Sequence, residues 1–389
     1  MLKVEKSRRI KEVPPYLFAE IDKIKAEQIA KGVDVIDLTI GDPDLPTPPD
    51  IISQMKKSID DPKNHTYPSY VGMIEMRQAV AKWYQNRFNV NLNPETEVII
   101  LIGSKEGIAH LPLAFIDSGD YGLVPDPGYP VYKTSIQFAG GTPHFLPLLR
   151  ENCYLPELDK ISQTILEKSK LLFLNYPNNP TSATAEKKFF EQAIAFCRDH
   201  NIILCHDAAY TEIYFNGKKP LSFLEVEGAK EVGIEFHSLS KTFNMTGWRL
   251  GFAVGNSEII AALGQIKTNI DSGCFKAIQE AGITALQKNL SETEKLRKIY
   301  QERKEIILSG LTKTSLTVDP PVATFYVWLP VPDGYSSIEF TTHLLNQTGI
   351  LTTPGNGFGP SGEGFIRMSL TAPTERIKEA ANRMSSLSF

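Results

Sequence analysis

Between roughly residues 95 and 255, short apolar runs alternate with longer amphipathic stretches. The runs are almost continuously hydrophobic, which is typical of strands buried on both faces of a mostly parallel sheet. The stretches between them, such as residues 186–200, have the pattern of helices, so this part of the chain predicts an α/β layer domain. The strands that we expect are residues 98–102, 121–124, 171–175, 202–206, 233–237 and 250–254.

The segments on either side have a different pattern and predict a smaller domain built from both ends of the chain. The elements expected there are a helix at 17–32, a short strand ending near Gly41, a long charged helix at 291–309, strands at 325–329 and 365–370, and a C-terminal helix. We therefore expect an N-terminal arm with the first part of the small domain, a large domain, and the rest of the small domain at residues 1–48, 49–285 and 286–389, respectively.

The composition is that of an ordinary globular protein. The chain has 389 residues, of which 42% are hydrophobic and 22% are charged, and its formal net charge is −4. A nucleic-acid-binding protein would need a clustered basic face, and the four cysteines lack the spacing of metal ligands. No apolar run approaches the ~20 residues of a membrane span, and the N-terminus lacks the apolar stretch of a signal peptide. We therefore expect a cytoplasmic protein without a metal, a membrane or a nucleic-acid partner.

Lys241, in the segment SLSKTFNMTGWRLG, has the most informative surroundings in the chain. A lysine that forms a Schiff base needs a desolvated or cationic setting, because the protonated amine is a poor nucleophile. Ser238, Ser240 and Arg249 surround this lysine and together could hold a phosphate. The combination predicts a site for pyridoxal phosphate (PLP), with Lys241 bonded to the cofactor aldehyde. The alternative is a surface loop that happens to carry a lysine.

Asp207 closes a buried strand in HDAAYTE. A buried carboxylate is costly unless it is paired, and the pyridinium nitrogen of PLP is a suitable partner that would keep the ring able to accept electrons. Tyr210, further along the same segment, could reach the 3′ oxygen of that ring. The alternative for Asp207 is a carboxylate that caps a following helix.

Asn179 lies in NYPNNPT, which follows another expected strand. Two prolines fix the backbone on either side, so the segment predicts a rigid loop. The Asn179 amide could donate to the 3′ oxygen of the cofactor and to a substrate carboxylate. Asn-Asn-Pro alone is a common turn, and its place before the Asp207 strand is what favours a functional role.

The turn GSKEG at residues 103–107 follows the first central strand and opens a helix. Free N–H groups at a helix N-terminus bind anions, so we assign Ser104 and Lys105 to the cofactor phosphate. A serine that merely caps an ordinary helix is the alternative. Tyr129, in a stiff Pro-Gly-Tyr-Pro turn, could stack on the cofactor ring and border the substrate, or only pack the turn. Tyr67 could supply a hydroxyl to the phosphate.

Arg367 lies on the expected strand at 365–370. Alternation places Ile366 and Met368 on the face that forms the core of the small domain, so Arg367 points the other way. There its planar guanidinium could bind a carboxylate through two hydrogen bonds. The alternative is an exposed arginine on the surface of the strand.

Together the motifs SLSKTFNMTGWRLG, NYPNNPT, HDAAYTE and GSKEGI resemble those of the fold-type I PLP enzymes, specifically the class I/II aminotransferases. The likeness covers essentially the whole chain. More narrowly, PPYLFAEID, IGDPDLPTP and HTYPSYVG are similar to segments of the short-form LL-diaminopimelate aminotransferases of lysine biosynthesis. The resemblance implies an aspartate aminotransferase-like fold, whose large domain has a mostly parallel seven-stranded sheet.

The resemblance also implies roles for particular residues. Tyr16 and Gly41 would border the substrate, Lys105 would meet its distal group, and Arg367 would bind its α-carboxylate. It implies further a homodimer with shared active sites, into which Tyr67 and Asn269 reach from the neighbouring subunit.

Two positions depart from the pattern of the family. Ser182 stands where a glycine usually follows Asn-Pro-Thr. Tyr70 stands where the longer diaminopimelate enzymes have an acidic residue that reads the distal amine, so recognition of that amine is unexplained by the resemblance.

The predicted reaction is a transamination between an amino acid, LL-2,6-diaminopimelate, and 2-oxoglutarate, in which Lys241 moves the proton of the substrate Cα and Asp207 and Tyr210 assist through the ring. Three alternatives remain. The chain could prefer aspartate, alanine or an aromatic amino acid, it could be a PLP lyase or synthase on the same fold, or it could be a regulator that has lost catalysis.

Overall fold

The computed structural model describes residues 2–13, 17–288, 291–314 and 316–387. Its largest feature is a seven-stranded sheet with the order β2-β8-β7-β6-β5-β3-β4. Only β8 runs against its neighbours; the other strands of this sheet are parallel to one another. The strands are β2 Val98–Leu101, β3 Tyr121–Asp126, β4 Thr142–Pro147, β5 Ser169–Asn175, β6 Ile203–Asp207, β7 Gly233–Ser238 and β8 Gly251–Gly255.

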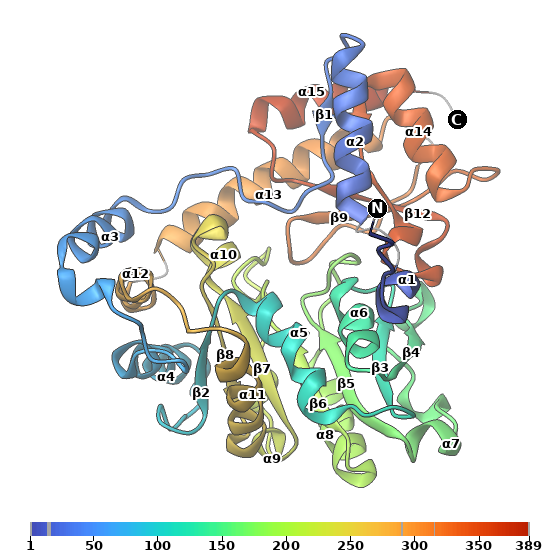
Figure 1. The fold of residues 1–389 in the computed structure, drawn as a ribbon. Helices are drawn as coiled ribbons and strands as arrows, with labels where there is room; N and C mark the ends of the chain where they lie inside the picture. Colours follow the sequence, from blue (N-terminus) through green and yellow to red (C-terminus); the bar gives the residue numbers. More distant parts are fainter. Residues whose placement is uncertain (1, 14–16, 289–290, 315, 388–389) are drawn as a thin grey trace.

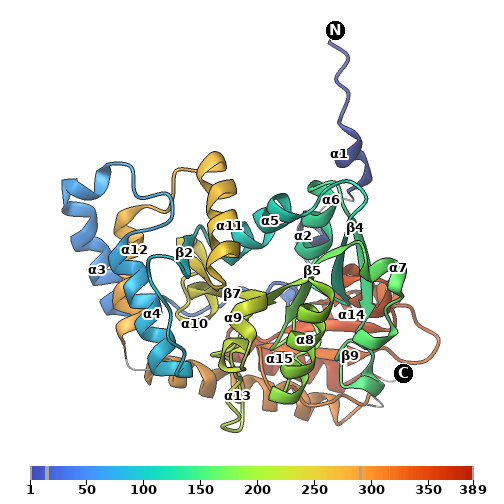
Figure 2. The ribbon, with the colours of Figure 1, turned by 90° about the horizontal axis from the view of Figure 1, so that it is seen from below.

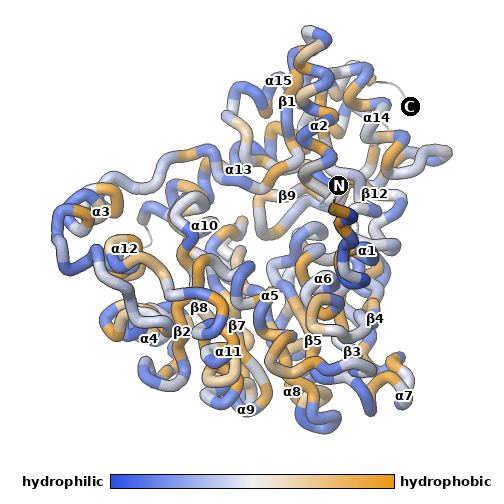
Figure 3. The backbone as a smooth tube through the Cα atoms, viewed as in Figure 1, coloured by the Kyte–Doolittle hydropathy of each residue, from blue (hydrophilic) through white to orange (hydrophobic). Residues whose placement is uncertain are grey.

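Helices cover both faces of this sheet, which explains why its strands are apolar on both sides (Figures 1 and 3). Along β5, Leu171 and Phe173 pack against one layer, whereas Leu172 and Leu174 pack against the other. The first layer contains α5 Ser104–Phe115, α6 Val131–Phe138 and α11 Ser257–Ile270. The second contains α4 Ile74–Phe88, α8 Lys187–His200, α9 Ala229–Val232 and α12 Lys276–Gln287.

A second core joins the beginning of the chain to its end. Ile36 and Leu38 pack in one cluster with Val327, Ile366 and other C-terminal residues. The strands there are β1 Ile36–Asp37 paired with β10 Ile350–Leu351, and a sheet of β11 Thr353–Pro354, β12 Phe365–Ser369 and β9 Tyr326–Pro330. Helices α2 Leu17–Ala30, α13 Ser291–Leu311, α14 Ser337–Thr348 and α15 Thr374–Ser385 belong to the same part of the molecule (Figure 1).

The remaining helices connect or flank these two parts. They are α1 Arg8–Glu12, α3 Pro49–Asp60, α7 Gln163–Leu166 and the short α10 Leu239–Thr242. The segment before α1 extends away from the rest of the chain (Figure 2). None of the helices within the described residues is long and apolar enough to cross a membrane.

The α/β prediction and all six expected central strands are confirmed, with small shifts at their ends. Strand β4 was not predicted, and the first strand of the chain is shorter than expected because it ends at Asp37 rather than near Gly41. The domain boundaries near residues 48 and 285 stay a prediction.

Candidate active site

A pocket of about 400 Å³ opens where the parallel strands of the large sheet end. Its walls come from both cores, because Asp207 and Ser238 end large-domain strands while Tyr326 and Arg367 lie on β9 and β12. Ligands of open α/β sheets bind at this edge. Twelve of the predicted site residues line the pocket: Gly41, Ser104, Lys105, Tyr129, Asn179, Asp207, Tyr210, Ser238, Ser240, Lys241, Arg249 and Arg367.

Lys241 lies on α10, directly after β7. The Ser238 hydroxyl accepts a hydrogen bond from the backbone N–H of Ser240. This bond caps the short helix and so fixes the position of the turn that carries Lys241. The Lys241 ammonium donates to the carbonyl oxygen of Gly41 at 2.5 Å. Burial lowers the pKa of Lys241 to about 8, Asp42 opposes this shift, and the cations Arg249 and Arg367 add to it. A larger fraction of this side chain is therefore the neutral amine at neutral pH than in an exposed lysine.

Asp207 ends β6 and is only 6% exposed. Its carboxylate accepts a hydrogen bond from the Tyr132 hydroxyl at 2.7 Å and a longer one from the Ala209 backbone N–H at 3.3 Å. Burial raises the pKa of Asp207, and the bond from Tyr132 only partly opposes that rise. The residues that follow form turns, so the alternative of a helix-capping aspartate is wrong.

Asn175 holds the loop that carries Asn179 against the end of β6. Its amide nitrogen donates to the carbonyl oxygen of Asp207 at 2.7 Å, and its amide oxygen accepts from the backbone N–H of Asn179 at 2.8 Å. The Asn179 side-chain oxygen in turn accepts from Arg367 Nη1 at 2.7 Å. Because that oxygen is occupied, the Asn179 Nδ2 group is the part of the amide left to donate to a bound ligand.

The turn before α5 depends on glycine. Gly103 has φ +78° and is the N-cap of the helix, and a Cβ there would lie 2.4 Å from Arg249 Nη2. The turn and the guanidinium are therefore in close contact. Ser104 is the first residue of the helix and does not cap it, so the alternative of a simple capping serine is wrong. Hydrogen-bond donors of the α5 N-terminus, Ser238, Ser240 and Arg249 thus line the pocket.

Arg367 is almost completely buried, with 1% of its surface exposed. It donates to the carbonyl oxygen of Thr39 at 2.5 Å as well as to Asn179, and its guanidinium lies 4.1 Å from the ring of Tyr326 and 4.7 Å from that of Phe358. The alternative of an exposed strand arginine is wrong. Two aromatic faces and two acceptors fix its plane, which suits recognition of a planar carboxylate.

Three predicted residues are not in this pocket. Tyr67 is 82% exposed, and Asn269 is exposed with its amide nitrogen bonded to the carbonyl oxygen of Gln265 at 2.8 Å. Tyr16 lies outside the described residues.

Sequence reasoning missed several residues of the site, notably Tyr132, Tyr326 and Asp42. The Tyr326 hydroxyl lies 3.1 Å from that of Tyr210, and a Cβ on Gly41 would lie 1.8 Å from it. Gly41 is therefore needed for the close packing of the N-terminal segment on Tyr326. Tyr132 had one usable signal, its position in the helix that follows the Pro-Gly-Tyr-Pro turn.

A group of possible metal ligands that includes two residues of α5 already surrounds a lysine ammonium. Glu106, His110 and Asp271 offer ligand atoms within 4.8 Å of one another. The buried ammonium of Lys267 donates to Glu106 at 3.2 Å and to both oxygens of Asp271 at 2.8 Å. This lysine balances the acidic charge, so we assign no metal there.

Comparison with known proteins shows what the chain is similar to. Residues 33–384 match the family model for Aminotransferase class I and II. The LL-diaminopimelate aminotransferase of Syntrophobacter fumaroxidans is 58% identical over 99% of both chains, and that of Aquifex aeolicus is 55% identical over 98% of this chain and 99% of its own. The substrate-bound structure of BacF from Bacillus subtilis is 38% identical, covers 98% of both chains and superposes with a TM-score of 0.95.

Proposed function

The chain belongs to the class I and II aminotransferases, and we propose that it uses pyridoxal phosphate to transfer an amino group from LL-2,6-diaminopimelate to 2-oxoglutarate. One observation carries the proposal: Lys241, Asp207 and Arg367 come from distant parts of the chain and line one pocket. Each matches a different chemical demand of transamination, namely a nucleophilic amine, a partner for a ring nitrogen and a carboxylate anchor.

The residues present fit the cofactor. Asp207 is buried with a raised pKa and, within the described part of the chain, no ion pair to offset its charge. A protonated pyridine nitrogen would supply the missing cation. When bound, pyridoxal phosphate contributes an electrophilic aldehyde carbon and a ring that withdraws electrons from the substrate Cα.

We assign the rest of the pocket by the chemistry of each side chain. The donors at Ser104, Ser238, Ser240 and Arg249 would hold the phosphate, with Lys105 nearby. Tyr210 and the Asn179 amide nitrogen would donate to the ring oxygen, and Tyr129 would lie against the ring face.

Two residues act on the substrate itself. Arg367 would bind the α-carboxylate and so orient the Cα–H bond. Lys241 would first react as the neutral amine and then take the proton from Cα and return it to the cofactor side, because the same nitrogen is both a base and, once protonated, an acid. Its lowered pKa, about 8, suits both tasks near neutral pH.

The names of the relatives support diaminopimelate as the donor, since the two compared at 55% and 58% identity are both called LL-diaminopimelate aminotransferase. A donor panel tests this directly. Purified enzyme is mixed with LL-diaminopimelate, aspartate, alanine or an aromatic amino acid, and the conversion of the cofactor to its amine form is followed by absorbance. We expect diaminopimelate to react fastest; a much faster reaction with another donor would contradict the assignment.

Lys241→Ala tests whether this lysine carries the chemical step. It should fold and bind the cofactor without a covalent link but lose turnover by several orders of magnitude, because the nucleophile and the proton carrier are the same group. A folded variant that kept most of its activity would remove the basis for the proposal.

We also propose that the active form is a homodimer with shared sites. Support comes from Tyr67, which is 82% exposed although its hydroxyl is assigned to a cofactor phosphate. Asn269, which the resemblance also places in the site of the neighbouring subunit, is exposed as well. Sedimentation should give the mass of two chains, and Tyr67→Phe should weaken cofactor retention without changing that mass.

A further inference from the structure

The charges of the pocket point to a residue that reads the distal end of the substrate. Among the described residues, the cationic side chains that line it are Lys105, Lys241, Arg249 and Arg367, and the carboxylates are Asp42 and Asp207. This inference rests on the proposed function, in which the cofactor and one donor molecule occupy the pocket together.

Nearly all of these charges have a partner in that arrangement. The cofactor phosphate would pair with Arg249, the ring nitrogen of the cofactor with Asp207, and the α-carboxylate of the substrate with Arg367. The donor α-amine would replace the Lys241 amine at the aldehyde carbon of the cofactor, so neither group needs a carboxylate partner. The distal carboxylate of diaminopimelate would pair with Lys105. One charge of the substrate, the distal ammonium, and one charge of the pocket, the Asp42 carboxylate, then remain to be paired with each other.

We propose that the Asp42 carboxylate binds the distal ammonium of diaminopimelate and so selects a donor with two amino groups. Within the part of the chain that the structure describes, this carboxylate makes no hydrogen bond and no ion pair, and its side chain is exposed at the pocket wall. An ammonium placed against it would gain a charge-assisted hydrogen bond without displacing an existing one.

The backbone around Asp42 is held firmly on both sides. The Gly41 carbonyl accepts from Lys241 at 2.5 Å, and the Thr371 hydroxyl donates to the Ile40 carbonyl at 2.7 Å. On the other side, Asp44 accepts two hydrogen bonds from the buried guanidinium of Arg303, at 2.6 and 2.8 Å. Asp42 is therefore presented from a fixed segment, which limits the entropy lost when a ligand binds.

The test compares two donors that differ only at the distal amine. L-2-aminopimelate has the carbon chain and both carboxylates of diaminopimelate but lacks the second amino group. We expect Asp42→Asn to reduce the ratio of kcat/KM for LL-diaminopimelate over L-2-aminopimelate by about ten- to a hundredfold, the value of one charge-assisted hydrogen bond. Asp42→Glu keeps the charge and should retain more of the ratio than Asp42→Asn.

The ratio separates recognition from a general effect on the lysine. Asp42 raises the pKa of Lys241, so its removal changes the rate with every donor, and this common factor cancels between the two substrates. If Asp42→Asn slows both donors equally, the inference is overturned and the distal amine is read elsewhere. If the unchanged enzyme does not react with diaminopimelate at all, the proposed function itself fails.

Discussion

Lys241 has a lowered pKa before any ligand binds, chiefly because its side chain is buried. An exposed lysine, with an ordinary pKa of 10.5, is almost fully protonated at neutral pH, whereas burial brings this one to about 8. Because the neutral amine is the nucleophile, its available fraction rises as the pH increases through that value.

The expected consequence is a pH-dependent capture of the cofactor. The rate at which apoenzyme forms its covalent link should rise from about pH 6 and level off above the pKa near 8, rather than climbing toward pH 10. Stopped-flow absorbance after mixing with excess cofactor measures this rate. A rate that continued to rise up to the range of a free lysine would show that the desolvated site does not tune the amine.

Tyr132 gives a second prediction at the same scale. Its hydroxyl, kept protonated because burial and then Asp207 raise its pKa, is the side-chain donor to Asp207, while its ring stacks on Phe173 with centroids 5.2 Å apart. Tyr132→Phe keeps the ring and removes the donor. The pKa of Asp207 should rise further, and we expect the cofactor to dissociate with a Kd about tenfold higher.

Equilibrium dialysis of the cofactor would measure that loss. Tyr121→Phe is a suitable control, since Tyr121 lies at the start of β3 with its ring against His144 and does not line the pocket. Equal affinities in the two variants would mean that the Tyr132 hydroxyl does not support the charge of Asp207.

At the scale of elements, a buried polar pair joins the two strands that end at the site. His206 on β6 and Glu235 on β7 are register partners with no exposed surface. Glu235 accepts hydrogen bonds from His206 Nδ1 at 2.8 Å, from Tyr84 at 2.7 Å and from Ser222 at 2.7 Å. Burial alone would raise the pKa of Glu235, but these donors outweigh burial and lower it, so the carboxylate is charged.

Glu235→Gln should therefore be costly although it preserves shape. The imidazole proton points at Glu235 because His206 Nε2 accepts the Tyr176 backbone N–H at 3.3 Å. A glutamine can turn its amide oxygen to Nδ1–H, but its NH2 group then lies against the Tyr84 and Ser222 hydroxyls. Both hydroxyls now donate to the carboxylate and would have to reverse, and the charge that strengthens all of these bonds is lost. We expect the free energy of unfolding to fall by about 3 kcal/mol, measured by urea denaturation.

Glu225→Gln is the matched control for this variant. Glu225 closes a capping box by accepting from the Ser222 backbone N–H at 2.8 Å, and it is exposed. An amide oxygen can keep that bond, so the loss should stay near or below about 1 kcal/mol. A similar loss in both variants would refute a special role for the buried pair.

Much of the large sheet could be predicted because its strands are apolar on both faces. Strand β4 could not, since Pro143 and Pro147 interrupt it and its edge position leaves Thr142 exposed. The reversed direction of β8 was also inaccessible, because hydrophobic pattern does not encode strand direction. The sequence motifs identified most of the residues that line the pocket. Tyr132 and Tyr326 look like ordinary core residues in the sequence, and only the folded structure shows that they line the site.

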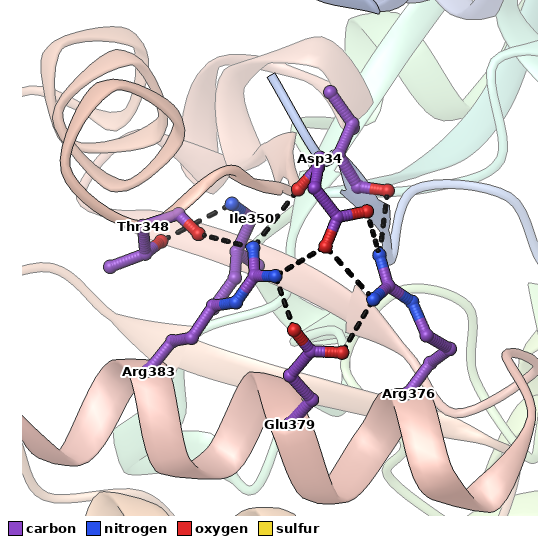
Figure 4. Close-up of polar contacts among 7 residues, drawn as sticks. Asp34, Thr348, Ile350, Arg376, Glu379 and Arg383 are labelled. Atoms are coloured by element: carbon purple, nitrogen blue, oxygen red, sulfur yellow. Dashed lines mark hydrogen bonds and ion pairs between the residues drawn. The ribbon is translucent and has the colours of Figure 1, made fainter. Parts of the chain in front are cut away.

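At the scale of the whole molecule, the two ends of the chain are joined by a cluster of ion pairs (Figure 4). Asp34, just before β1, accepts hydrogen bonds from Arg376 at 2.7 Å and from Arg383 at 2.5 Å, both on α15. Glu379 lies between the two arginines and pairs with each. Arg383 also donates to the carbonyl oxygen of Thr348 at 2.9 Å, so α14 joins the same cluster.

This cluster matters for the site because the strand after Asp34 leads to Gly41 and Asp42. The N-terminal segment contributes only the short strand β1 to the sheet with β10, so side-chain contacts supplement its few backbone hydrogen bonds. A network in which one carboxylate meets two arginines is worth more than an isolated surface pair.

Asp34→Asn should accordingly lower the melting midpoint at neutral pH by a few degrees, and by more than Asp319→Asn does. Asp319 is a close control: its side chain is 60% exposed against 63% for Asp34, and among the described residues it forms an ion pair only with Arg150. The hydrogen bonds from Arg376 and Arg383 hold the pKa of Asp34 below its ordinary value of 3.8. The stabilisation is therefore complete above that value and is lost as the pH falls through the lower pKa of the folded state. Melting curves of the parent and Asp34→Asn should converge over this acidic range, and a difference that stayed constant with pH would show that the asparagine acts through packing rather than charge.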